Sequence, residues 1–567
     1  MDLETLRHSC SHLLAQAVKE LYPKVKLGMG PAIENGFYYD FDKAEPFTPE
    51  DLKKIEKKMY EIAKRKLPIE KAKLTKKEQT DFFKIEPYKK ELAKELKTPT
   101  FFKQGDFIDL CKGPHVENTK ELKGLYKLSK VAGAYWKGDS NNKQLQRIYG
   151  YAFESKDKLK AFRKLLEEAE RRDHKKLGKQ LELFSIHDEA PGMPFFHNKG
   201  AFIFETLKEY LTQELRGLNY ELNMTPIILN KNLWLQSGHW DHYQDNMYFT
   251  KIDKQDFAVK PMNCPGNILI FKTKLHSYRE LPIKAGEFGL VHRHELSGVL
   301  SGLFRVRVFT QDDAHIYCTE KQLKDQIIEL IDLIDRVYST FGFTYDLELS
   351  TRPEKAMGAK KTWDSAEKSL KQALETKKLK YKINEGDGAF YGPKIDFHIK
   401  DALGRGWQCG TIQLDFQMPE KFDLNYEGKD GKKHRPIMLH RTIFGSFERF
   451  IGVLIEHFAG KFPLWLSPVQ VKILTVTDRA NKFAEKIITE LKENNIRVEI
   501  DDRSESISKK VREATLQKVN YILTIGDKEV ENKTLAVRHR SGKVDFGVTT
   551  KKFLQQLQKE IDTKQIK

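Results

Sequence analysis

Two predicted strands between residues 291 and 315 carry charged and aromatic side chains where a buried strand would carry aliphatic ones. The segment reads VHRHELSGVLSGLFRVRVFTQDDAH, and strand residues of equal parity point to the same face. On the outgoing strand, Arg293 and Glu295 share a face. The returning strand would place on one face the odd-numbered residues Arg305, Arg307, Phe309, Gln311, Asp313 and His315.

This charged face predicts contact with a ligand rather than with a hydrophobic core. Burying so many charges without partners would cost more free energy than the stability of one domain. Guanidinium groups suit phosphate oxygens, an aromatic ring can stack on a base, and a carboxylate can accept a hydrogen bond from an exocyclic amine. The face therefore predicts a nucleotide site, and the alternative is an exposed hairpin held by salt bridges.

Length and composition limit the class of protein. The 567 residues are too many for one core, and about 150 residues per domain predicts three or four domains. Hydrophobic residues make up 39% and charged residues 32%, as in ordinary soluble globular proteins. No apolar run approaches the ~20 residues of a membrane span, and the start MDLETLRHSC is unlike a secretory signal. We therefore expect no membrane association.

Charge and cysteine content indicate a partner and a compartment. The net charge of +18 favours a polyanionic partner, nucleic acid first, although lysine-rich helices on a solvated surface are the alternative. Five scattered cysteines, an odd number, argue against a disulfide framework and predict a reducing cytoplasm.

Compositional shifts divide the chain into four predicted segments. Residues 1–154 mix short strands with lysine-rich helices such as the one around Asp51–Lys66, and residues 155–183 have the apolar spacing of an amphipathic linker helix. Residues 184–468 contain the charged face and antiparallel strand signals. In residues 469–567 strands and helices alternate, which predicts a small α/β domain around a mainly parallel sheet.

Several segments resemble one enzyme family. His292–Glu295 with Phe304–Phe309 resembles motif 2 of class II aminoacyl-tRNA synthetases, and Leu439–Arg449 resembles motif 3. Motif 1 would be the helix Phe204–Gly217 followed by Pro226. KPMNCPG, TRPEK, YGPK, QCGTIQLDF and GDKEVE are similar, in the same order, to segments of the threonyl-tRNA synthetases.

The resemblance implies an α+β multidomain protein with a class II antiparallel-sheet catalytic core, an α+β editing domain and a C-terminal α/β anticodon-binding domain. It implies a threonine–tRNA ligase that uses ATP with Mg²⁺ to form threonyl-adenylate and passes L-threonine to tRNA(Thr). Motif 1 forms the subunit interface in this class, so a cytoplasmic homodimer is expected. The resemblance also implies that the N-terminal ubiquitin-like domain of many bacterial relatives is missing.

Roles at the nucleotide site follow from the same resemblance. Arg293 would hold the α-phosphate of ATP, and Arg305 and Arg449 the γ-phosphate end. Glu295 would accept a hydrogen bond from the adenine amine while Phe309 stacks on the ring. The expected ATP contacts are Arg293, Glu295, Arg305, Phe309, Gln413, Ser446 and Arg449. The expected catalytic residues are Arg293, Arg305, Arg449, Lys394 and His239, the last linked in the family to the transfer of threonine, with a solvated loop histidine as the alternative.

The resemblance also implies one zinc ion per chain. Cys264, His315 and His440 match the family's three zinc ligands, and three protein ligands leave an open coordination position. The family uses that position to bind the amino and hydroxyl groups of threonine, so valine, which lacks the hydroxyl, is rejected. Asn267 and His294 depart from the family pattern at positions that are not ligands. The expected threonine contacts are Gln311, Asp313, Tyr391 and Lys394.

A second cluster lies in the first segment. His8 and His12 are spaced to share one helical face, and Cys111 and His115 follow in CKGPH. By ligand type alone, this set could hold a structural zinc. The resemblance implies instead the family's editing site, which hydrolyses seryl-tRNA(Thr) without a required metal. Its expected residues are His8, His12, Asp109, Cys111 and His115. Such a site is needed because a missing methyl group supplies only about 1–3 kcal/mol of discrimination.

The last segment resembles the anticodon-binding domain of the family. Glu529 and Arg538 match residues that meet anticodon bases, while Lys528 and Arg540 would contact phosphates. An ordinary charged strand edge is the alternative for all four. Two other functions compete with threonine ligation. A ligase for proline, serine or histidine would share motifs 2 and 3 but not the zinc trio. A non-enzymatic RNA-binding paralogue would have lost residues such as Arg293 or Arg449, and neither is lost.

Overall fold

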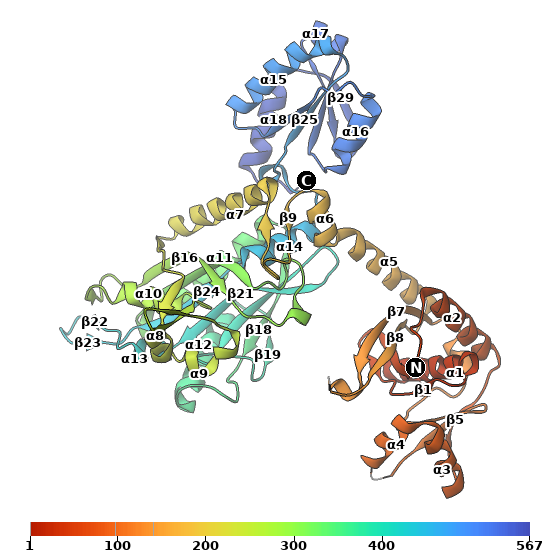
Figure 1. Cartoon of the computed structure of the whole chain (residues 1–567). Coiled ribbons are helices and arrows are strands. Elements are labelled where there is room, and N and C mark those ends of the chain that lie inside the picture. The colour runs from red at the N-terminus through yellow and green to blue at the C-terminus, as the bar shows by residue number, and fades with distance from the viewer. Residues whose placement is uncertain (1, 97, 140, 567) are drawn as a thin grey trace. The chain divides into compact units, whose positions relative to one another are not determined.

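In the computed structural model, helix α1 (Leu3–Leu21) organises the beginning of the chain (Figure 1). The Asp2 carboxylate accepts a hydrogen bond from the Thr5 amide at 3.0 Å, an N-cap that satisfies one of the free donors of the first turn. The apolar side of α1, including the fully buried Leu14, packs against α2 (Pro49–Lys64) and β3 (Gly36–Asp42). The predicted helical face with His8 and His12 is therefore part of a regular helix.

The structure describes residues 2–96, 98–139 and 141–566, and these fall into two units, Met1–Glu168 and Ala169–Lys567. No described helix is long and apolar enough to cross a membrane. The first unit holds one sheet in the order β1-β3-β8-β7, with β2 beside β3, and a second sheet in the order β4-β5-β6. Its further elements are β1 (Lys26–Leu27), β2 (Ala32–Ile33), β4 (Ile69–Ala72), α3 (Lys76–Ile85), α4 (Pro87–Lys94), β5 (Phe101–Gln104), β6 (Phe107–Leu110), β7 (Tyr126–Tyr135) and β8 (Gln144–Ala152).

The segment predicted as a linker helix, residues 155–183, is two helices. They are α5 (Lys156–Arg172) and α6 (His174–Gln180). Asp173 lies between them, and its carboxylate accepts hydrogen bonds from the amides of the next helix, which begins there. Leu177 of α6 is buried in the core of the following sheet, so this helix packs as part of the second unit. The sequence pattern predicted the apolar spacing correctly, but it did not predict the break between the two helices at Asp173.

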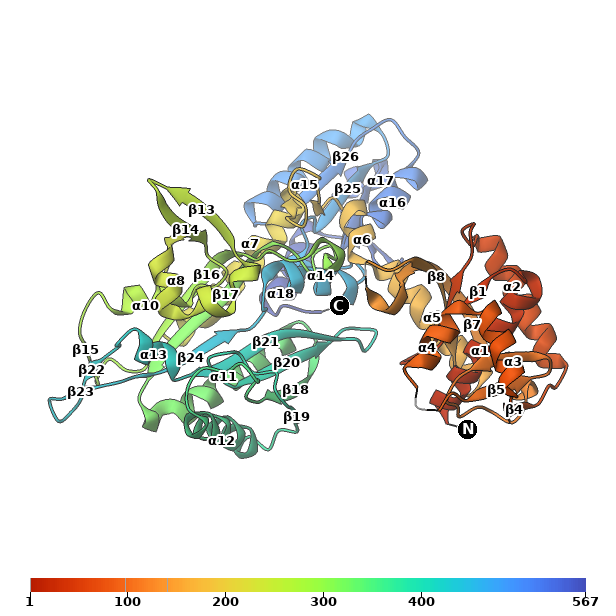
Figure 2. The ribbon, with the colours of Figure 1, turned by 60° about the horizontal axis from the view of Figure 1, so that its bottom comes forward.

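An eight-stranded sheet forms the centre of the second unit (Figure 2). Its order is β11-β16-β17-β24-β21-β20-β18-β19, with parallel pairs only at its two ends. Helices α11 and α12 pack against β20, β21 and β24. The strands are β11 (Glu221–Leu222), β16 (Ile283–His292), β17 (Val308–Cys318), β18 (Thr344–Ser350), β19 (Lys382–Asn384), β20 (Lys394–Lys400), β21 (Gly406–Asp415) and β24 (Ile437–Thr442).

Helices and small strands surround this sheet. Thr319 and Gln322 form a capping box at the start of α11 (Glu320–Thr340), and its buried residues recur at helical spacing. The other helices are α7 (Asn198–Gly217), α8 (Lys231–Ser237), α9 (His239–His242), α10 (Cys264–Phe271), α12 (Lys360–Thr376), α13 (Gln417–Lys421) and α14 (Phe447–His457). The small strands are β9 (Phe184–Ser185), β10 (Phe195–Phe196), β12 (Ile228–Asn230), β13 (Tyr248–Ile252), β14 (Gln255–Val259), β15 (His276–Ser277), β22 (Tyr426–Glu427) and β23 (Lys433–His434).

The charged strand pair has its predicted antiparallel arrangement, but its strands are shorter than predicted. The last β16–β17 pair is His292 with Val308, so residues 293–307 form the connection. Arg305 and Arg307 therefore precede the strand, and strict alternation does not fix their directions. From Phe309 to His315 the alternation holds, and these odd-numbered residues share a face.

The C-terminal domain has a mixed sheet, in the order β26-β25-β27-β28-β29. β25, β26 and β27 are parallel, whereas β27, β28 and β29 pair antiparallel, so the prediction of a mainly parallel sheet holds for only half of the pairings. Half-buried Arg497 joins this domain to the catalytic part by donating to the carbonyls of Ser467, Leu464 and Trp465. The elements are β25 (Val471–Thr475), α15 (Asn481–Glu493), β26 (Val498–Asp501), α16 (Ile507–Leu516), β27 (Tyr521–Ile525), α17 (Asp527–Asn532), β28 (Leu535–His539), β29 (Val544–Val548) and α18 (Thr550–Asp562).

We predict that a fragment of residues 1–168 folds by itself, because its hydrophobic core is built entirely from its own residues. In this fragment Leu14→Ala should lower the free energy of unfolding by about 2–5 kcal/mol, since the side chain is fully buried. Urea unfolding followed by circular dichroism measures this change. Exposed Lys53→Ala is the control and should stay within about 0.5 kcal/mol of the parent. A fragment without a cooperative transition would contradict the prediction.

Candidate active site

A cavity of about 430 Å³ lies on the odd-numbered face of β17 and contains most of the predicted nucleotide residues. Gln408 and Thr411 from β21, Thr442 from β24 and Asp396 from β20 also line it and were not predicted from the sequence. The predicted residues that line it are Arg293, Glu295, Arg305, Phe309, Gln311, Gln413, Ser446 and Arg449.

Backbone carbonyls and an aromatic ring hold two guanidinium groups in this cavity. Arg449 donates to the carbonyl oxygens of Phe304 at 3.0 Å and Gln408 at 3.1 Å. Arg293 donates to the carbonyl of Pro261 at 3.2 Å, and its guanidinium lies 5.0 Å from the centre of the Phe309 ring. Neutral carbonyls leave the positive charge of both arginines uncompensated, which suits them to an anionic ligand.

Arg305 and Arg307 differ from these two. Arg305 forms an ion pair with Glu295 at 2.9 Å, so both predicted groups lie in the cavity and contact each other. Arg307 is not part of the lining, because its guanidinium donates to the carbonyls of Glu295 and Pro191 and to the Ser297 hydroxyl. The prediction that Arg307 shares the ligand face is wrong, and the reason is that it lies in the connection before β17.

Two buried carboxylates tie β17 to the segment that follows β24. Asp312 of β17 accepts hydrogen bonds from the amides of Ile443 at 2.6 Å and Phe444 at 3.0 Å. In the reverse direction, Glu448 of α14 accepts from the Thr310 amide with both oxygens, at 2.9 and 3.1 Å. Burial raises the pKa of Asp312 to about 7 and that of Glu448 to about 8. These contacts fix Phe309 and Gln311 relative to Ser446 and Arg449.

The three predicted zinc ligands come together, with potential ligand atoms within 4.8 Å of one another. Cys264, His315 and His440 are all buried, and β17–β24 pairing puts the two histidines opposite each other. Neither ring nitrogen of His315 has a hydrogen-bond partner among the described residues, which is costly for a buried imidazole unless it binds something. Nε2 of His440 lies 2.9 Å from the carboxylate of Asp415, which would orient the ring. This donor set fits a zinc ion.

Burial shifts the pKa values of His315 and Cys264. It lowers the pKa of His315 well below the ordinary value and raises that of the Cys264 thiol well above it. A neutral imidazole is the form that binds a metal, whereas the thiol must lose its proton on binding. Asp415 was not predicted, although its position two residues after Gln413 on one strand face could have indicated it.

The other predicted residues of this site surround the trio. Buried His239 lies with Nδ1 2.8 Å from the Ser237 hydroxyl and with Nε2 4.0 Å from the Cys264 sulfur, so it is not a solvated loop histidine. Tyr391 donates a hydrogen bond to Gln413. Its ring centre is 4.9 Å from that of His440.

Two predicted residues are held by polar neighbours. Asp313 accepts from the amide of Asn263 at 3.1 Å, and burial raises its pKa. Lys394 forms ion pairs with Asp396 at 2.9 Å and Asp387 at 3.1 Å. Lys394 is not part of the cavity lining, but its partner Asp396 is.

The two departures from the family pattern lie outside the trio. Buried Asn267 accepts a hydrogen bond from the Tyr317 hydroxyl at 2.9 Å, while His294 is exposed.

The cluster of the first unit also assembles. Potential ligand atoms of His8, His12, Cys111 and His115 lie within 4.8 Å of one another. His8, His12 and Cys111 border a cavity of about 600 Å³ that is also lined by Asp109, whereas His115 is not part of the lining. Burial lowers the pKa of His8 and His12 and takes that of His115 to about 2, so all three imidazoles are neutral.

Asp109 contacts three other polar residues of this cavity. Its carboxylate accepts from the Tyr39 hydroxyl at 2.5 Å, pairs with buried Lys89 at 2.6 Å and lies 3.7 Å from Nε2 of His12. Lys89 was missed because one lysine among many on lysine-rich helices gives no sequence signal. The arrangement offers a hydrogen-bonding carboxylate, an ammonium and neutral imidazoles to a ligand in the cavity.

The predicted anticodon residues lie in the C-terminal domain. Glu529 caps α17 by accepting from the Gly526 amide at 2.9 Å, and Arg538 on β28 donates to the Gly542 carbonyl at 3.1 Å. Lys528 is exposed. Arg540 donates to the carbonyls of Phe462, Lys518 and Val519, so its guanidinium is already occupied and the prediction of a direct phosphate contact is not supported by its geometry.

Comparison with known proteins matches every part of this architecture. Residues 248–458 match the family described as tRNA synthetase class II core domain (G, H, P, S and T). Residues 470–560 match the anticodon binding domain, and residues 100–149 the threonyl and alanyl tRNA synthetase second additional domain.

Similar whole chains and one similar structure point the same way. A threonine–tRNA ligase of Clostridium tetani is 59% identical over 99% of this chain and 88% of its own length. That of Carboxydothermus hydrogenoformans is 58% identical over 99% and 89%. The solved RNA binding domain of threonyl-tRNA synthetase from Cryptosporidium parvum is 40% identical with a TM-score of 0.66, covering 68% of this chain and 98% of that one.

We predict that Glu448 makes the stability of the second unit depend on pH. Its pKa is about 8 in the folded protein against an ordinary 4.5, so between these values the unfolded chain releases a proton that the folded protein keeps. Stability should therefore fall as pH rises from about 5 to 8. Glu448→Gln should flatten this decline in thermal midpoint, measured by scanning calorimetry, whereas exposed Glu375→Gln should not. Equal slopes for wild type and Glu448→Gln would contradict the prediction.

Proposed function

Because this chain belongs to the threonine–tRNA ligase family of class II synthetases, we propose roles for the individual residues of its three sites. The enzyme joins threonine to tRNA with ATP as the energy source, and it carries an editing domain. The observation that carries the proposal is the buried Cys264, His315 and His440 trio, in which His315 has unsatisfied ring nitrogens.

We propose that this trio holds one zinc ion. When bound, the ion supplies an open coordination position for the amino and hydroxyl groups of threonine. Asp415 orients His440 by its hydrogen bond. Asp313, held by Asn263, accepts a hydrogen bond from the substrate hydroxyl, and this contact excludes an amino acid without one. Gln311, Tyr391 and Lys394 complete the proposed threonine pocket.

The adjacent cavity is the proposed site of ATP with Mg²⁺. Arg293 would hold the α-phosphate and Arg449 the γ-phosphate, because both keep an uncompensated charge. Arg305 would leave Glu295 to meet the γ-phosphate, and Glu295 would then accept from the adenine amine. The threonine carboxylate attacks the α-phosphorus in line, and pyrophosphate leaves with the bonding electrons. The remaining proposed ATP contacts are Phe309, Gln413 and Ser446.

Two further roles concern tRNA. His239, buried beside Cys264, would take part in the transfer of threonine to the terminal ribose. In the editing cavity, His8, His12 and Cys111 would position the mischarged ester and a water molecule, with Asp109 as an acceptor and His115 behind Cys111. Glu529 and Arg538 would meet the anticodon; these two assignments rest on the family resemblance.

A homodimer and a cytoplasmic location complete the proposal. Met224, after the motif 1 helix, is 93% exposed, and Leu222, Ile227 and Ile228 beside it are also exposed. Such a patch of apolar side chains is typical of a protein interface. All five cysteines are free, as in a protein of a reducing compartment.

The first prediction from this proposal concerns the metal. Purified enzyme should contain about one zinc per chain, and Cys264→Ser or His440→Ala should abolish threonine-dependent ATP–pyrophosphate exchange. The physical reason is that two remaining ligands hold zinc weakly and leave threonine without its anchor. Zinc is measured by mass spectrometry alongside the exchange rate.

Cys318→Ser is the matched control for these variants, since Cys318 is also buried in the core but belongs neither to the trio nor to the lining of the nucleotide cavity. It should retain zinc and most of the exchange activity. Full exchange by rigorously zinc-free wild type would overturn the assignment.

The second prediction concerns fidelity. His8→Ala combined with His12→Ala should leave threonine charging nearly unchanged and let seryl-tRNA(Thr) accumulate. The pocket that binds a hydroxyl cannot strongly exclude serine, which lacks only a methyl group, so correction depends on the editing cavity. Seryl-tRNA formed over time on one transcript is the measurement. Exposed Lys53→Ala in the same unit is the control. Equal accumulation in the double variant and wild type would remove the editing role.

A further inference from the structure

A cavity of about 250 Å³ in the second unit has only basic residues as its charged lining. It lies where the catalytic part meets the C-terminal domain. Lys461 follows α14, whereas every other lining residue belongs to the C-terminal domain. Within the described residues no aspartate or glutamate lines it. The lining is Lys461, Val511, Thr515, Lys518, Val519, Ile522, Arg538, His539, Arg540 and Gly542.

Arg540 gives this cavity a fixed positive charge. Its guanidinium donates to the carbonyls of Phe462 at 2.6 Å, Lys518 at 2.6 Å and Val519 at 3.3 Å. Burial lowers its pKa to about 10. A guanidinium held only by neutral carbonyls keeps its full charge, so this part of the cavity wall attracts anions.

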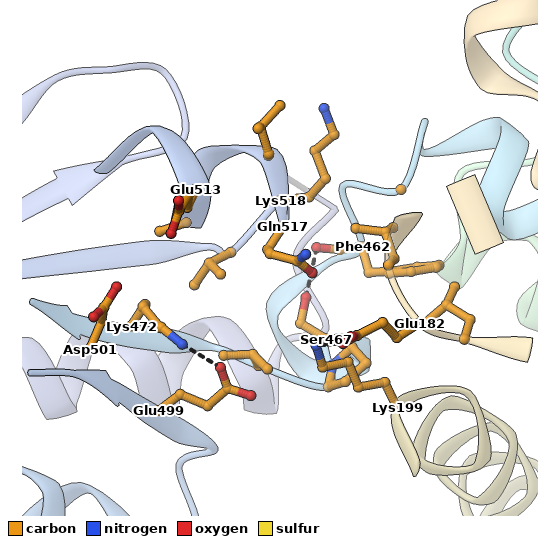
Figure 3. Close-up of a pocket in the computed structure, with 18 of the residues that line it drawn as sticks. Glu182, Lys199, Phe462, Ser467, Lys472, Glu499, Asp501, Glu513, Gln517 and Lys518 are labelled. Atoms are coloured by element: carbon orange, nitrogen blue, oxygen red, sulfur yellow. Dashed lines mark hydrogen bonds and ion pairs between the residues drawn. The ribbon is translucent and has the colours of Figure 1, made fainter. Parts of the chain in front are cut away.

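Two lysines at the cavity have no partner for their ammonium groups among the residues that the structure describes. Lys461 is exposed and Lys518 half-buried. The pKa of Lys518 is lowered by burial and by the charges of Lys461 and Arg540, so three cations repel one another here. Figure 3 shows the Lys518 side chain pointing away from Gln517 and Phe462. An anion between these cations would remove the repulsion.

A larger neighbouring cavity has both acidic and basic residues in its lining. It has a volume of about 590 Å³ and shares Lys518, Val519 and Arg540 with the smaller cavity (Figure 3). Two of its other cations are paired: Lys472 with Glu499 at 2.7 Å and Lys199 with Glu182 at 2.7 Å. The described lining of the smaller cavity has no acidic residues, so the charge of Lys518 and Arg540 is compensated less on that side.

We propose that the smaller cavity binds a phosphodiester group of the tRNA backbone in the anticodon arm. Lys461 and Lys518 contact the phosphate oxygens, and Arg540 contributes its field from the wall. The choice of the anticodon arm rests on the proposed function, because Arg538 lines the same cavity. Since Lys461 and Lys518 come from the catalytic part and the C-terminal domain, one phosphate is held by both and links anticodon binding to the catalytic part.

The test is the affinity of the full-length enzyme for tRNA(Thr) as a function of salt. The variant combines Lys461→Gln with Lys518→Asn; asparagine is chosen because Lys518 has φ +57°, a conformation that asparagine tolerates. At ~0.1 M salt the affinity should fall about tenfold, and the slope of log K against log salt should decrease by about 1. ATP–pyrophosphate exchange should stay unchanged, since neither lysine lies in the active site.

Lys486→Gln is the matched control, because Lys486 is an exposed lysine of the same domain beside Glu485 and Glu490. Unchanged affinity and slope in the double variant, or an equal loss in the control, would overturn the proposal. Stabilisation of wild type by inorganic phosphate, together with unchanged tRNA affinity in the double variant, would assign the cavity to free anions and also overturn it.

A second transcript with an altered anticodon separates this proposal from the anticodon assignment. The lysine variant should weaken both transcripts equally, because a phosphate contact carries no base information. Arg538→Ala should instead reduce the ratio between the two affinities. A silent lysine variant beside an effective Arg538→Ala would reject the phosphate site alone. An unchanged ratio in Arg538→Ala would reject the anticodon role.

Discussion

The pairing of β17 with β24 is the constraint on which the rest of the active site depends. In this register His315 lies opposite His440, and on the other side of β24 Gln413 also lies opposite His440. A slip of one residue would turn the side chains of β17 to the other face of the sheet. It would separate the two histidines and move Gln311 out of the nucleotide cavity. Asp312 resists such a slip, because its carboxylate accepts hydrogen bonds from the two amides that follow β24.

The hydrogen-bond partners of four arginines determine where positive charge is left free in the second unit. Arg293, Arg449 and Arg540 are held by backbone carbonyls, which fix a guanidinium without neutralising it. Arg441, by contrast, is buried against the carboxylate of Asp312 and serves the fold. For these four arginines the partner separates two uses: a carbonyl leaves charge for a phosphate, and a buried carboxylate compensates it. This distinction cannot be read from the sequence, in which all four are arginines.

The sequence predicted what depends on local spacing. The face of α1 with His8 and His12 and the odd-numbered face from Phe309 to His315 follow from helix and strand periods. The predictions from sequence were wrong where a single residue sets the end of a helix or the direction of a side chain. Asp173 breaks the predicted linker helix, and Arg307 turns to backbone carbonyls outside β17. Both errors arise because caps and connections depend on side-chain hydrogen bonds rather than on periodicity.

Residues whose roles depend on distant neighbours were also not predicted from the sequence. Lys89 and Lys461 are two lysines among many in the sequence, and the role of Asp415 follows only from its contact with His440. The zinc trio itself came from family resemblance, because Cys264, His315 and His440 are too widely spaced for any ligand motif. The fold supplies the missing information by bringing distant strands and helices into one site.

The two histidine–cysteine clusters differ in the hydrogen bonds that their histidine ring nitrogens make. In the first unit, Nδ1 of His115 lies 3.1 Å from the Ser9 hydroxyl and Nε2 lies 3.1 Å from the Cys111 sulfur. Those ring nitrogens are already satisfied without a metal. His315 also lies beside a histidine and a cysteine, yet neither of its ring nitrogens has a hydrogen-bond partner within the described chain. Because a buried polar group without a partner is costly, this difference supports the proposed zinc ion at the second cluster. The same residue types therefore fit two different proposed roles, a metal centre in one unit and ester hydrolysis in the other.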